Sequence, residues 1–137
     1  MTSQRFPQLG CGAAILEGGR LLLVRRRRPP EAGHWGLPGG KVDWGERVEA
    51  ATIREIAEEL GIAIRCEKLL TVADQIHEDA HWVAPVFLAE ITAGRPEVKE
   101  PEALADADWF ALDRLPAPLT IATQAALDAL NAGGDTP

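Results

Sequence analysis

The chain has 137 residues, a length that suits one domain with a sizeable buried core. Hydrophobic residues make up 46% and charged residues 26%, as in ordinary globular proteins. The net charge of −7 argues against a surface that binds nucleic-acid polymers, because such surfaces are usually basic. No apolar run approaches the roughly 18 residues that a membrane helix needs, which argues against membrane insertion. We therefore predict a single domain over residues 1–137.

The N-terminal segment and the cysteines bear on the cellular compartment. Residues 1–10, MTSQRFPQLG, lack the apolar core of a secretory signal, so a cytoplasmic location is the default. Cys11 and Cys66 are too few for a disulfide framework or a zinc site. We expect both to be buried free thiols in a reducing compartment.

The chain begins with two predicted strands. Residues 9–16, LGCGAAIL, predict a buried strand, and residues 21–24 predict a second one after a turn at 17–20. The two are expected to form a hairpin. Residues 25–28 are all arginine. A solvated basic strand end explains most of these arginines, but the planar guanidinium also suits phosphate oxygens.

The middle of the chain combines a glycine turn with an acidic helix. Residues 37–40, LPGG, let bare backbone approach a neighbouring surface and offer carbonyl oxygens. Periodicity predicts a helix over residues 46–60 that ends at Gly61, a residue type suited to a left-handed helix end. At roughly 100° per residue, three carboxylates share one face, opposite an apolar face; they are Glu55, Glu58 and Glu59. This face is either a solvated acidic surface or a site for Mg²⁺ or Mn²⁺.

Residues 40–62 resemble the Nudix box, G-x5-E-x7-R-E-U-x-E-E-x-G-U, in which U is an aliphatic residue. Every defined position is matched, by Gly40, Glu46, Arg54, Glu55, Ile56, Glu58, Glu59, Gly61 and Ile62. Chance would produce the whole pattern about once in 10⁹ starts at ordinary residue frequencies. The resemblance implies an α/β fold, the Nudix-type α/β/α sandwich with a mixed central β-sheet. It also implies metal-dependent hydrolysis of a nucleoside diphosphate linked to a further group.

Positions in the box carry implied roles. The resemblance implies that Glu55 and Glu59 bind the metal ion. Glu58 is implied to be a further ligand, or a base that acts through a bound water. The carbonyl of Gly40 is an additional candidate ligand.

Glu46 is expected to have a supporting role. On the helical wheel it lies about 180° from Glu55, so it is not expected to bind the metal directly. The resemblance implies that it pairs with Arg54. In a straight helix this reach of eight positions is long, so we expect a departure from ideal helix geometry near the N-terminus.

Other residues are expected to contact the substrate. In the family an arginine at the end of the second strand often faces the substrate phosphates, and the spacing to Trp35 points to Arg26. Gly39 and Gly40 lie on the same implied substrate-facing turn. A nucleobase is expected to stack on an aromatic residue, and the sequence leaves Trp35 and Trp82 open. For Trp35, packing beneath the box loop is the alternative.

Patterns of period two follow the helix. Residues 63–76 predict one long or two short strands, and residues 82–91 predict the next strand, paired as a hairpin. Pro85 cannot donate a ladder hydrogen bond, so it predicts an edge position or a bulge. His77 and His81 flank the turn between these strands, and we expect them to be solvated rather than to bind a metal.

The last third of the chain predicts a loop, a strand and a helix. Residues 92–107 predict a polar loop that is long for a compact domain. The resemblance implies that this loop supplies a further metal-binding carboxylate, and Glu100 and Glu102 both qualify. The remaining elements are a strand, a helix and a disordered tail, at residues 108–112, 119–130 and 131–137.

Substrate class depends on segments outside the box. In a window past the box glycine, ADP-ribose hydrolases of the family tend to carry Pro and diadenosine polyphosphate hydrolases Tyr. Residues 76–79, IHED, contain neither. The chain most resembles the MutT-like branch, which implies hydrolysis of a (d)NTP to a (d)NMP plus pyrophosphate with Mg²⁺, for which Mn²⁺ is a substitute. The alternatives are hydrolysis of nucleotide sugars or ADP-ribose, and a non-catalytic nucleotide sensor. A homodimer is a family-level expectation.

Overall fold

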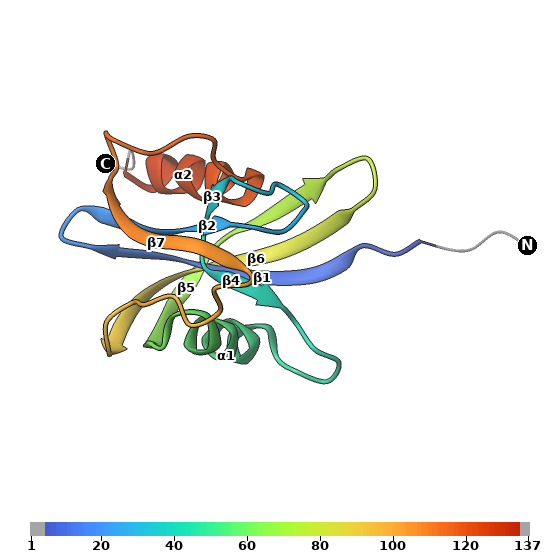
Figure 1. Ribbon diagram of the computed structural model, residues 1–137, viewed down its shortest axis with the longest axis horizontal. Coiled ribbons are helices and arrows are strands. Elements are labelled where there is room, and N and C mark those ends of the chain that lie inside the picture. Colours follow the sequence, from blue (N-terminus) through green and yellow to red (C-terminus); the bar gives the residue numbers. More distant parts are fainter. Residues whose placement is uncertain (1–4, 135–137) are drawn as a thin grey trace, which may run out of the picture.

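The computed structural model describes residues 5–134 of the chain. Figure 1 shows a middle layer of strands, with helix α1 covering one face and helix α2 the other. In chain order the elements are β1 (Gln8–Glu17), β2 (Arg20–Arg26), β3 (Trp35–Gly36), β4 (Gly39–Lys41), α1 (Val48–Leu60), β5 (Ala63–Ile76), β6 (His81–Ala93), β7 (Leu104–Ala111) and α2 (Ile121–Gly134). The predicted α/β/α sandwich is therefore confirmed.

Strand β1 lies at the centre of a mixed sheet. It pairs in parallel with β6 and antiparallel with β2 and β4. The sheet order is β3-β2-β1-β6-β5, and β7 adds to it by pairing with β2. At one end β1 forms the predicted hairpin with β2, where Leu16 pairs with Leu21. Towards its other end, Gly12 pairs with Gly39, so β4 brings the glycine turn against the central strand.

Both faces of β1 are buried, which explains its continuous apolar sequence. Side chains alternate between the two faces of a strand. Ala13 and Ile15 therefore pack on the α1 side with Ile56, whereas Ala14 packs on the α2 side with Leu21. The two cores hold both helices against one sheet, and they fix where the acidic face of α1 can point.

The C-terminal end of α1 agrees with the prediction. The helix ends at Leu60, and Gly61 adopts a φ of +68° while its N–H donates to the carbonyl of Ala57. This left-handed conformation is the reason for a glycine at this position. The end of the helix is thus fixed one residue beyond Leu60, where the chain turns into β5.

The N-terminal end of α1 differs from the prediction. The helix begins at Val48, after an extended Arg47 with φ −71° and ψ 144°, and Gly45 has a φ of +81°. Glu46 therefore lies in the loop before the helix, and the helical-wheel position expected for it is wrong. The physical reason is the turn at Gly45, which breaks the helical path before the apolar periodicity begins.

Pro85 lies in an internal strand. Strand β5 is a single strand of 14 residues at the sheet edge, and β6, which carries Pro85, lies between β5 and β1. The edge position expected for Pro85 is therefore wrong. The pairing of β1 with β6 passes from Leu9–Val83 to Gly12–Val86, and Pro85 falls in this interruption. A residue without an N–H is tolerated there because the ladder is already broken.

The loop before the last strand is shorter than predicted. Strand β6 continues to Ala93 and β7 begins at Leu104, so residues 94–103 form the loop instead of 92–107. After Leu104, strand β7 continues with ADAD at residues 105–108, a mixture of small and acidic residues that lacks the usual strand signal. Its pairing along the whole of β2 makes it a strand.

Helix α2 is longer than predicted. It spans Ile121–Gly134 instead of 119–130, so the disorder expected for residues 131–137 is wrong as far as residue 134. Residues 135–137 lie outside the described part of the chain. No helix within residues 5–134 is long and apolar enough to cross a membrane.

Both cysteines are free thiols, as expected. Cys11 is buried, but Cys66 is only half-buried because it lies on edge strand β5. Burial raises the pKa of both thiols, that of Cys66 to about 11. Neither is therefore an activated nucleophile.

Candidate active site

Glu59 is the most deeply buried carboxylate of the predicted site. Only 8% of the residue is exposed, and its Oε1 accepts a hydrogen bond of 2.8 Å from the backbone N–H of Gly39. Burial, together with the nearby carboxylates of Glu55 and Glu100, raises the pKa of Glu59 to about 8, against the hydrogen bond from Gly39 and the charge of Arg26. The glycine turn and the end of α1 thus hold a carboxyl group whose burial outweighs the nearby hydrogen bond and the charge of Arg26.

Glu55 lies against the second glycine of the turn. A Cβ placed on Gly40 would be 2.2 Å from Oε2 of Glu55, so a side chain at position 40 would occupy the space of this carboxylate. Burial raises the pKa of Glu55, and Arg54 partly offsets that effect. Gly40 is therefore required by close approach, as the predicted turn implied.

Arg54 gathers the other acidic residues of the box. Its Nε and one terminal nitrogen donate to Glu46 over 2.6 and 2.8 Å, which is a bidentate pair. Its second terminal nitrogen lies 3.0 Å from Glu55 and 3.2 Å from Glu58. The pair with Arg54 lowers the pKa of Glu46 to about 2. The pair expected between Glu46 and Arg54 is present, and Glu46 reaches it from the loop before the helix.

Of the two loop carboxylates, Glu100 lies near the site. The loop is attached to the end of α1, where Lys99 N–H donates to the Glu59 carbonyl over 2.8 Å. Glu100 is half-buried and close enough to raise the pKa of both Glu55 and Glu59. Glu102 is exposed. The structure therefore favours Glu100, a choice that the sequence left open.

The arginine run also holds this loop in place. The backbone N–H of Arg27 donates to the carbonyl of Ala103 over 2.9 Å, and its Nε donates to the carbonyl of Pro101 over 2.8 Å. Glu100 is thus fixed from two sides, by the end of α1 and by the end of β2. This structural role of Arg27 was missed, because a charge run does not reveal a backbone partner 74 positions away.

The donor groups fit a hard divalent cation. Within residues 5–134, no three His, Cys, Asp or Glu side chains already surround one point closely enough to form a complete metal site. Glu100 nevertheless raises the pKa of both Glu55 and Glu59, Glu55 raises that of Glu59, and all three offer oxygen ligands. A divalent cation favours the charged form of such a group, and oxygen ligands suit Mg²⁺ or Mn²⁺. These residues therefore fit a divalent cation by their charge and by the oxygen ligands that they offer.

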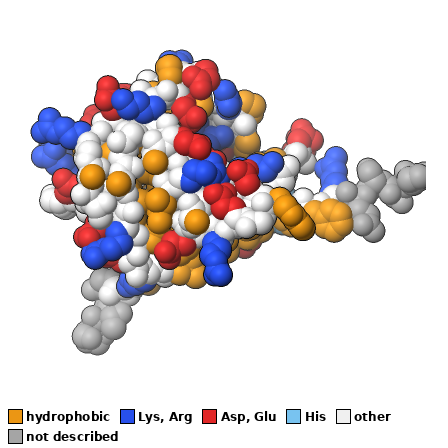
Figure 2. All heavy atoms as spheres, turned by 90° about the horizontal axis from the view of Figure 1, so that it is seen from below, with side chains coloured by type: hydrophobic (Ala, Val, Ile, Leu, Met, Phe, Trp, Pro, Cys, Tyr) orange, Lys and Arg blue, Asp and Glu red, His pale blue; other side chains and the backbone are white. Residues whose placement is uncertain are grey.

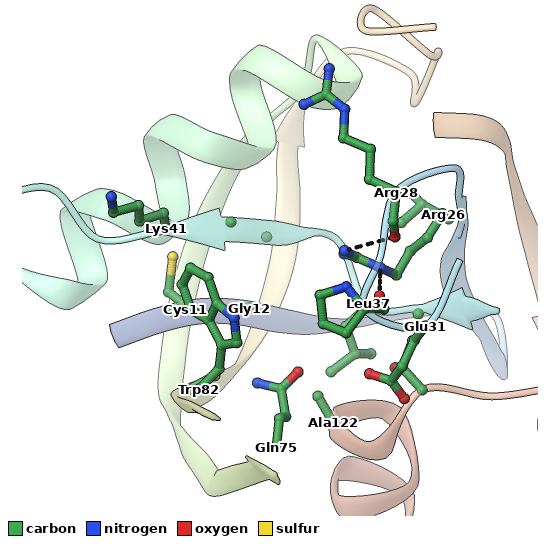
Figure 3. A pocket seen from close by; sticks show the side chains of 18 of the residues that line it. Cys11, Gly12, Arg26, Arg28, Glu31, Leu37, Lys41, Gln75, Trp82 and Ala122 are labelled. Carbon is green, nitrogen blue, oxygen red and sulfur yellow. Dashed lines mark hydrogen bonds between the residues drawn. The ribbon is translucent and has the colours of Figure 1, made fainter. Parts of the chain in front are cut away.

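A cavity of about 370 Å³ opens beside the carboxylates. The glycine turn and Gln75 line it, and Figure 3 shows Arg26 and Trp82 on opposite sides. The guanidinium of Arg26 is oriented by a 3.1 Å hydrogen bond from its Nε to the carbonyl of Pro30. The cavity thus joins a cationic side chain, the carboxylate site and an aromatic ring.

Trp35 has a packing role. It lies edge-on to Phe110, with ring centroids 4.9 Å apart, in the core on the α2 side of the sheet. It is not among the cavity-lining residues, whereas Trp82 is. The structure thus separates the two tryptophans between which the sequence did not choose.

The cavity also has lining residues that the sequence did not indicate. Glu31 and Gln75 are two of them, and Thr120 at the start of α2 is a third. Oε2 of Glu31 accepts a 2.8 Å hydrogen bond from the N–H of Ile121, the first residue of α2. A φ of +64° at Glu31 was the missing information, since it turns a loop residue inwards.

His77 is less exposed than expected. Its side chain is 23% exposed, and Nε2 lies 3.6 Å from Oε1 of Glu31. Nε2 is buried without a hydrogen-bond partner. The expectation of a solvated His77 is therefore wrong, because the β5–β6 turn folds back onto the loop that carries Glu31.

The outer surface on the α1 side is neither mainly acidic nor mainly basic. Figure 2 shows that face, on which acidic and basic side chains lie beside one another. Arg54 with its acidic partners is an example of such a mixture. The acidic residues of the box thus divide into Glu46, Glu55 and Glu58, which contact Arg54, and Glu59, which is buried.

Comparisons with known proteins agree with this architecture. A family model described as the NUDIX domain matches residues 7–130. The crystal structure of a MutT NUDIX hydrolase from Burkholderia pseudomallei is 56% identical, with a TM-score of 0.89, and the match covers 92% of this chain and 99% of that one. A putative 8-oxo-dGTP diphosphatase 2 of Mycobacterium tuberculosis is 36% identical over 120 residues, which cover 78% of this chain and 83% of the relative. An ADP-ribose pyrophosphatase of Methanocaldococcus jannaschii is 34% identical over 112 residues, which cover 80% and 65%.

Proposed function

The chain belongs to the Nudix family of pyrophosphohydrolases, and from this premise we propose that its substrate is a nucleoside triphosphate. The reaction converts a (d)NTP and water into a (d)NMP and pyrophosphate. One observation carries the proposal: Glu59, held by the glycine turn, lines a cavity that Arg26 and Trp82 also line. This arrangement provides for phosphates at one side and a base at another.

The carboxylates would hold the divalent cation that members of this family typically require. In the proposal Glu55, Glu59 and Glu100 bind it, together with the carbonyl of Gly40. When bound, Mg²⁺ neutralises phosphate charge and lowers the pKa of a coordinated water. Glu58 is a further ligand or a base acting through a water, and these two roles stay open.

The remaining residues of the site position the reactants. Arg26 would neutralise and orient the phosphate oxygens, since its fork matches two oxygens at once. The bidentate pair of Arg54 and Glu46 holds the loop before α1 against the helix. Water attacks phosphorus, the P–O bond to the leaving pyrophosphate breaks, and the water proton passes to a carboxylate or to solvent.

One relative supports a triphosphate substrate, and another supports an alternative substrate. The Mycobacterium tuberculosis relative is named for 8-oxo-dGTP, which is an oxidised nucleoside triphosphate. The Methanocaldococcus jannaschii relative is named for ADP-ribose, at nearly the same identity. ADP-ribose and nucleotide sugars are therefore the alternative substrates of the same chemistry, and a nucleotide sensor without turnover is the alternative of another class.

A substrate panel tests the proposal. Purified protein with Mg²⁺ is incubated with the common dNTPs, 8-oxo-dGTP, ADP-ribose and a UDP-sugar, and the products are separated by ion-exchange chromatography. We expect monophosphate and pyrophosphate in equal amounts from the triphosphates. Activity confined to ADP-ribose or the UDP-sugar would sink the proposal, and binding of nucleotides without turnover would favour the sensor.

The expected homodimer stays a prediction. Size-exclusion chromatography with light scattering would distinguish a 14.8 kDa monomer from a dimer of twice that mass.

A further inference from the structure

One end of the cavity contains a polar side chain without a partner. Gln75 on β5 and Trp82 on β6 are directly paired across the antiparallel hairpin, and both line the cavity. Figure 3 shows the amide of Gln75 extending into the cavity between the indole of Trp82 and Ala122. Gly10 adjoins the indole, since a Cβ there would lie 3.4 Å from the Trp82 ring. An aromatic face and an amide thus border the same space.

The other polar side chains at this end already have partners. Glu31 accepts a hydrogen bond from the N–H of Ile121, and the hydroxyl of Thr120 lies 2.7 Å from that of Thr123. Within residues 5–134, no hydrogen bond satisfies the amide of Gln75. An amide carries two donor hydrogens and an acceptor oxygen, which form a hydrogen-bonding pair on one edge. In a half-buried position such groups are expected to bind water or a ligand.

We propose that Gln75 selects the nucleobase of the substrate by hydrogen bonding to its edge while the base stacks on Trp82. This inference rests on the proposed function, because it needs a substrate whose phosphates lie at the Arg26 side. A glutamine amide recognises bases with an adjacent donor and acceptor, as it does for adenine in nucleic acids. Stacking on an indole tolerates any base, so the amide supplies the discrimination.

Gln75 reaches the cavity from a different element than Glu59 and Arg26, which supports a separate role. Glu59, Arg26 and the glycine turn line the cavity from α1, β2 and β4, whereas Gln75 and Trp82 line it from the β5–β6 hairpin. A change at Gln75 should therefore alter which base is accepted without altering the chemistry at phosphorus. Gln75 is thus a specificity residue, and a substrate without a base is the matched probe.

The experiment measures kcat/KM for the four common dNTPs and for deoxyribose 5-triphosphate, which lacks a base. In the Gln75→Leu variant we expect the ratio between the best and the worst nucleobase to fall about tenfold, the factor that corresponds to one lost bidentate contact. The value for deoxyribose 5-triphosphate should stay unchanged. Gln124→Leu, the same change at an exposed position of α2, should leave the ranking of bases as in the wild type.

For a second variant, Gln75→Glu, we can predict which base should be favoured. Gln75→Glu replaces the amide donor by an acceptor, so guanine, whose Watson–Crick edge offers two adjacent donors, should gain relative to adenine. An unchanged ranking of bases in both folded variants, with folding checked by circular dichroism, would overturn the inference. If the wild type hydrolyses none of the triphosphates, the proposed function fails separately. Calorimetric binding of the same panel to the wild type and Gln75→Leu then decides the role of Gln75.

Discussion

Two glutamates of the same motif experience opposite environments. Glu46 shares two hydrogen bonds with Arg54, and its pKa is lowered to about 2. Glu59 is buried beside other carboxylates, and its pKa is raised to about 8. Arg54 compensates the charge of Glu46, whereas burial keeps a proton on Glu59, so the charged form of Glu59 needs a cation. The comparison indicates which part of the motif supports the site and which part is left for a cation.

We expect the largest loss of activity from a change at Glu59. Glu59→Gln keeps the shape of the side chain but removes the charge that would bind a divalent cation. We expect kcat to fall by about 10³-fold or more, with the fold intact. Glu49→Gln, an exposed position of the same helix, is the matched control. Turnover that stays at the wild-type level in Glu59→Gln would refute the metal-binding role.

Without a bound metal, the folded protein should become less stable as the pH rises, because of Glu59. Between pH 4.5 and about 8, the folded protein keeps a proton on Glu59 that the unfolded chain has released. The free energy of unfolding therefore decreases as pH rises through this interval, by up to a few kcal/mol, and is independent of Glu59 above it. Denaturant titrations in EDTA measure this slope, which Glu59→Gln should reduce. A slope equal to that of the wild type would assign the effect to other groups.

The loop carboxylates should differ from each other. Glu100 lies close enough to affect Glu55 and Glu59, whereas Glu102 is exposed. We expect Glu100→Gln to lower kcat by about 100-fold and Glu102→Gln to leave it nearly unchanged. Kinetics at saturating Mg²⁺ compare the two variants. The reverse order would show that the loop rearranges when the cation and substrate bind.

We expect the smallest loss of activity from a change in the ion pair between Arg54 and Glu46. Arg54→Lys keeps the positive charge but cannot form the bidentate pair with Glu46 and reach Glu55 at the same time. We expect a loss of activity of about tenfold, typical of residues that orient metal ligands. A loss as large as that of Glu59→Gln would mean that the two regions act as one unit. Mg²⁺ titrations of both variants distinguish a weaker cation affinity from slower chemistry.

The sequence predicted the motif well because its signals are local. The spacing from Gly40 to Ile62 is defined within one turn and one helix, and Gly61 ends that helix as its residue type indicates. Buried strand β1 was also predictable from its continuous apolar run. These features depend on neighbours in the chain, so no tertiary information was needed.

The features that the sequence missed depend on distant partners. Strand β7 is a strand because β2 lies beside it, although its first residues are small or acidic. The position of Glu46 depends on the turn at Gly45, and a helical wheel assumes that no such turn exists. Gln75 had no signal at all, because its role becomes visible only when the hairpin places it beside Trp82.

The attachment of the Glu100 loop to α1 restricts where this chain can change in length. Backbone N–H groups of Glu97 and Lys99 donate to the carbonyls of Leu60 and Glu59, and the Lys99 side chain covers Gly61. A residue inserted between Glu97 and Glu100 would shift the carboxylate relative to a helix end that cannot follow. Gly94 also adjoins this helix end, since a Cβ there would lie 3.0 Å from the carbonyl oxygen of Gly61, so the loop is attached on both sides of Arg95 and Pro96. Length variation within this protein's relatives, or in engineered versions of it, should therefore be confined to the short stretch between Gly94 and Glu97.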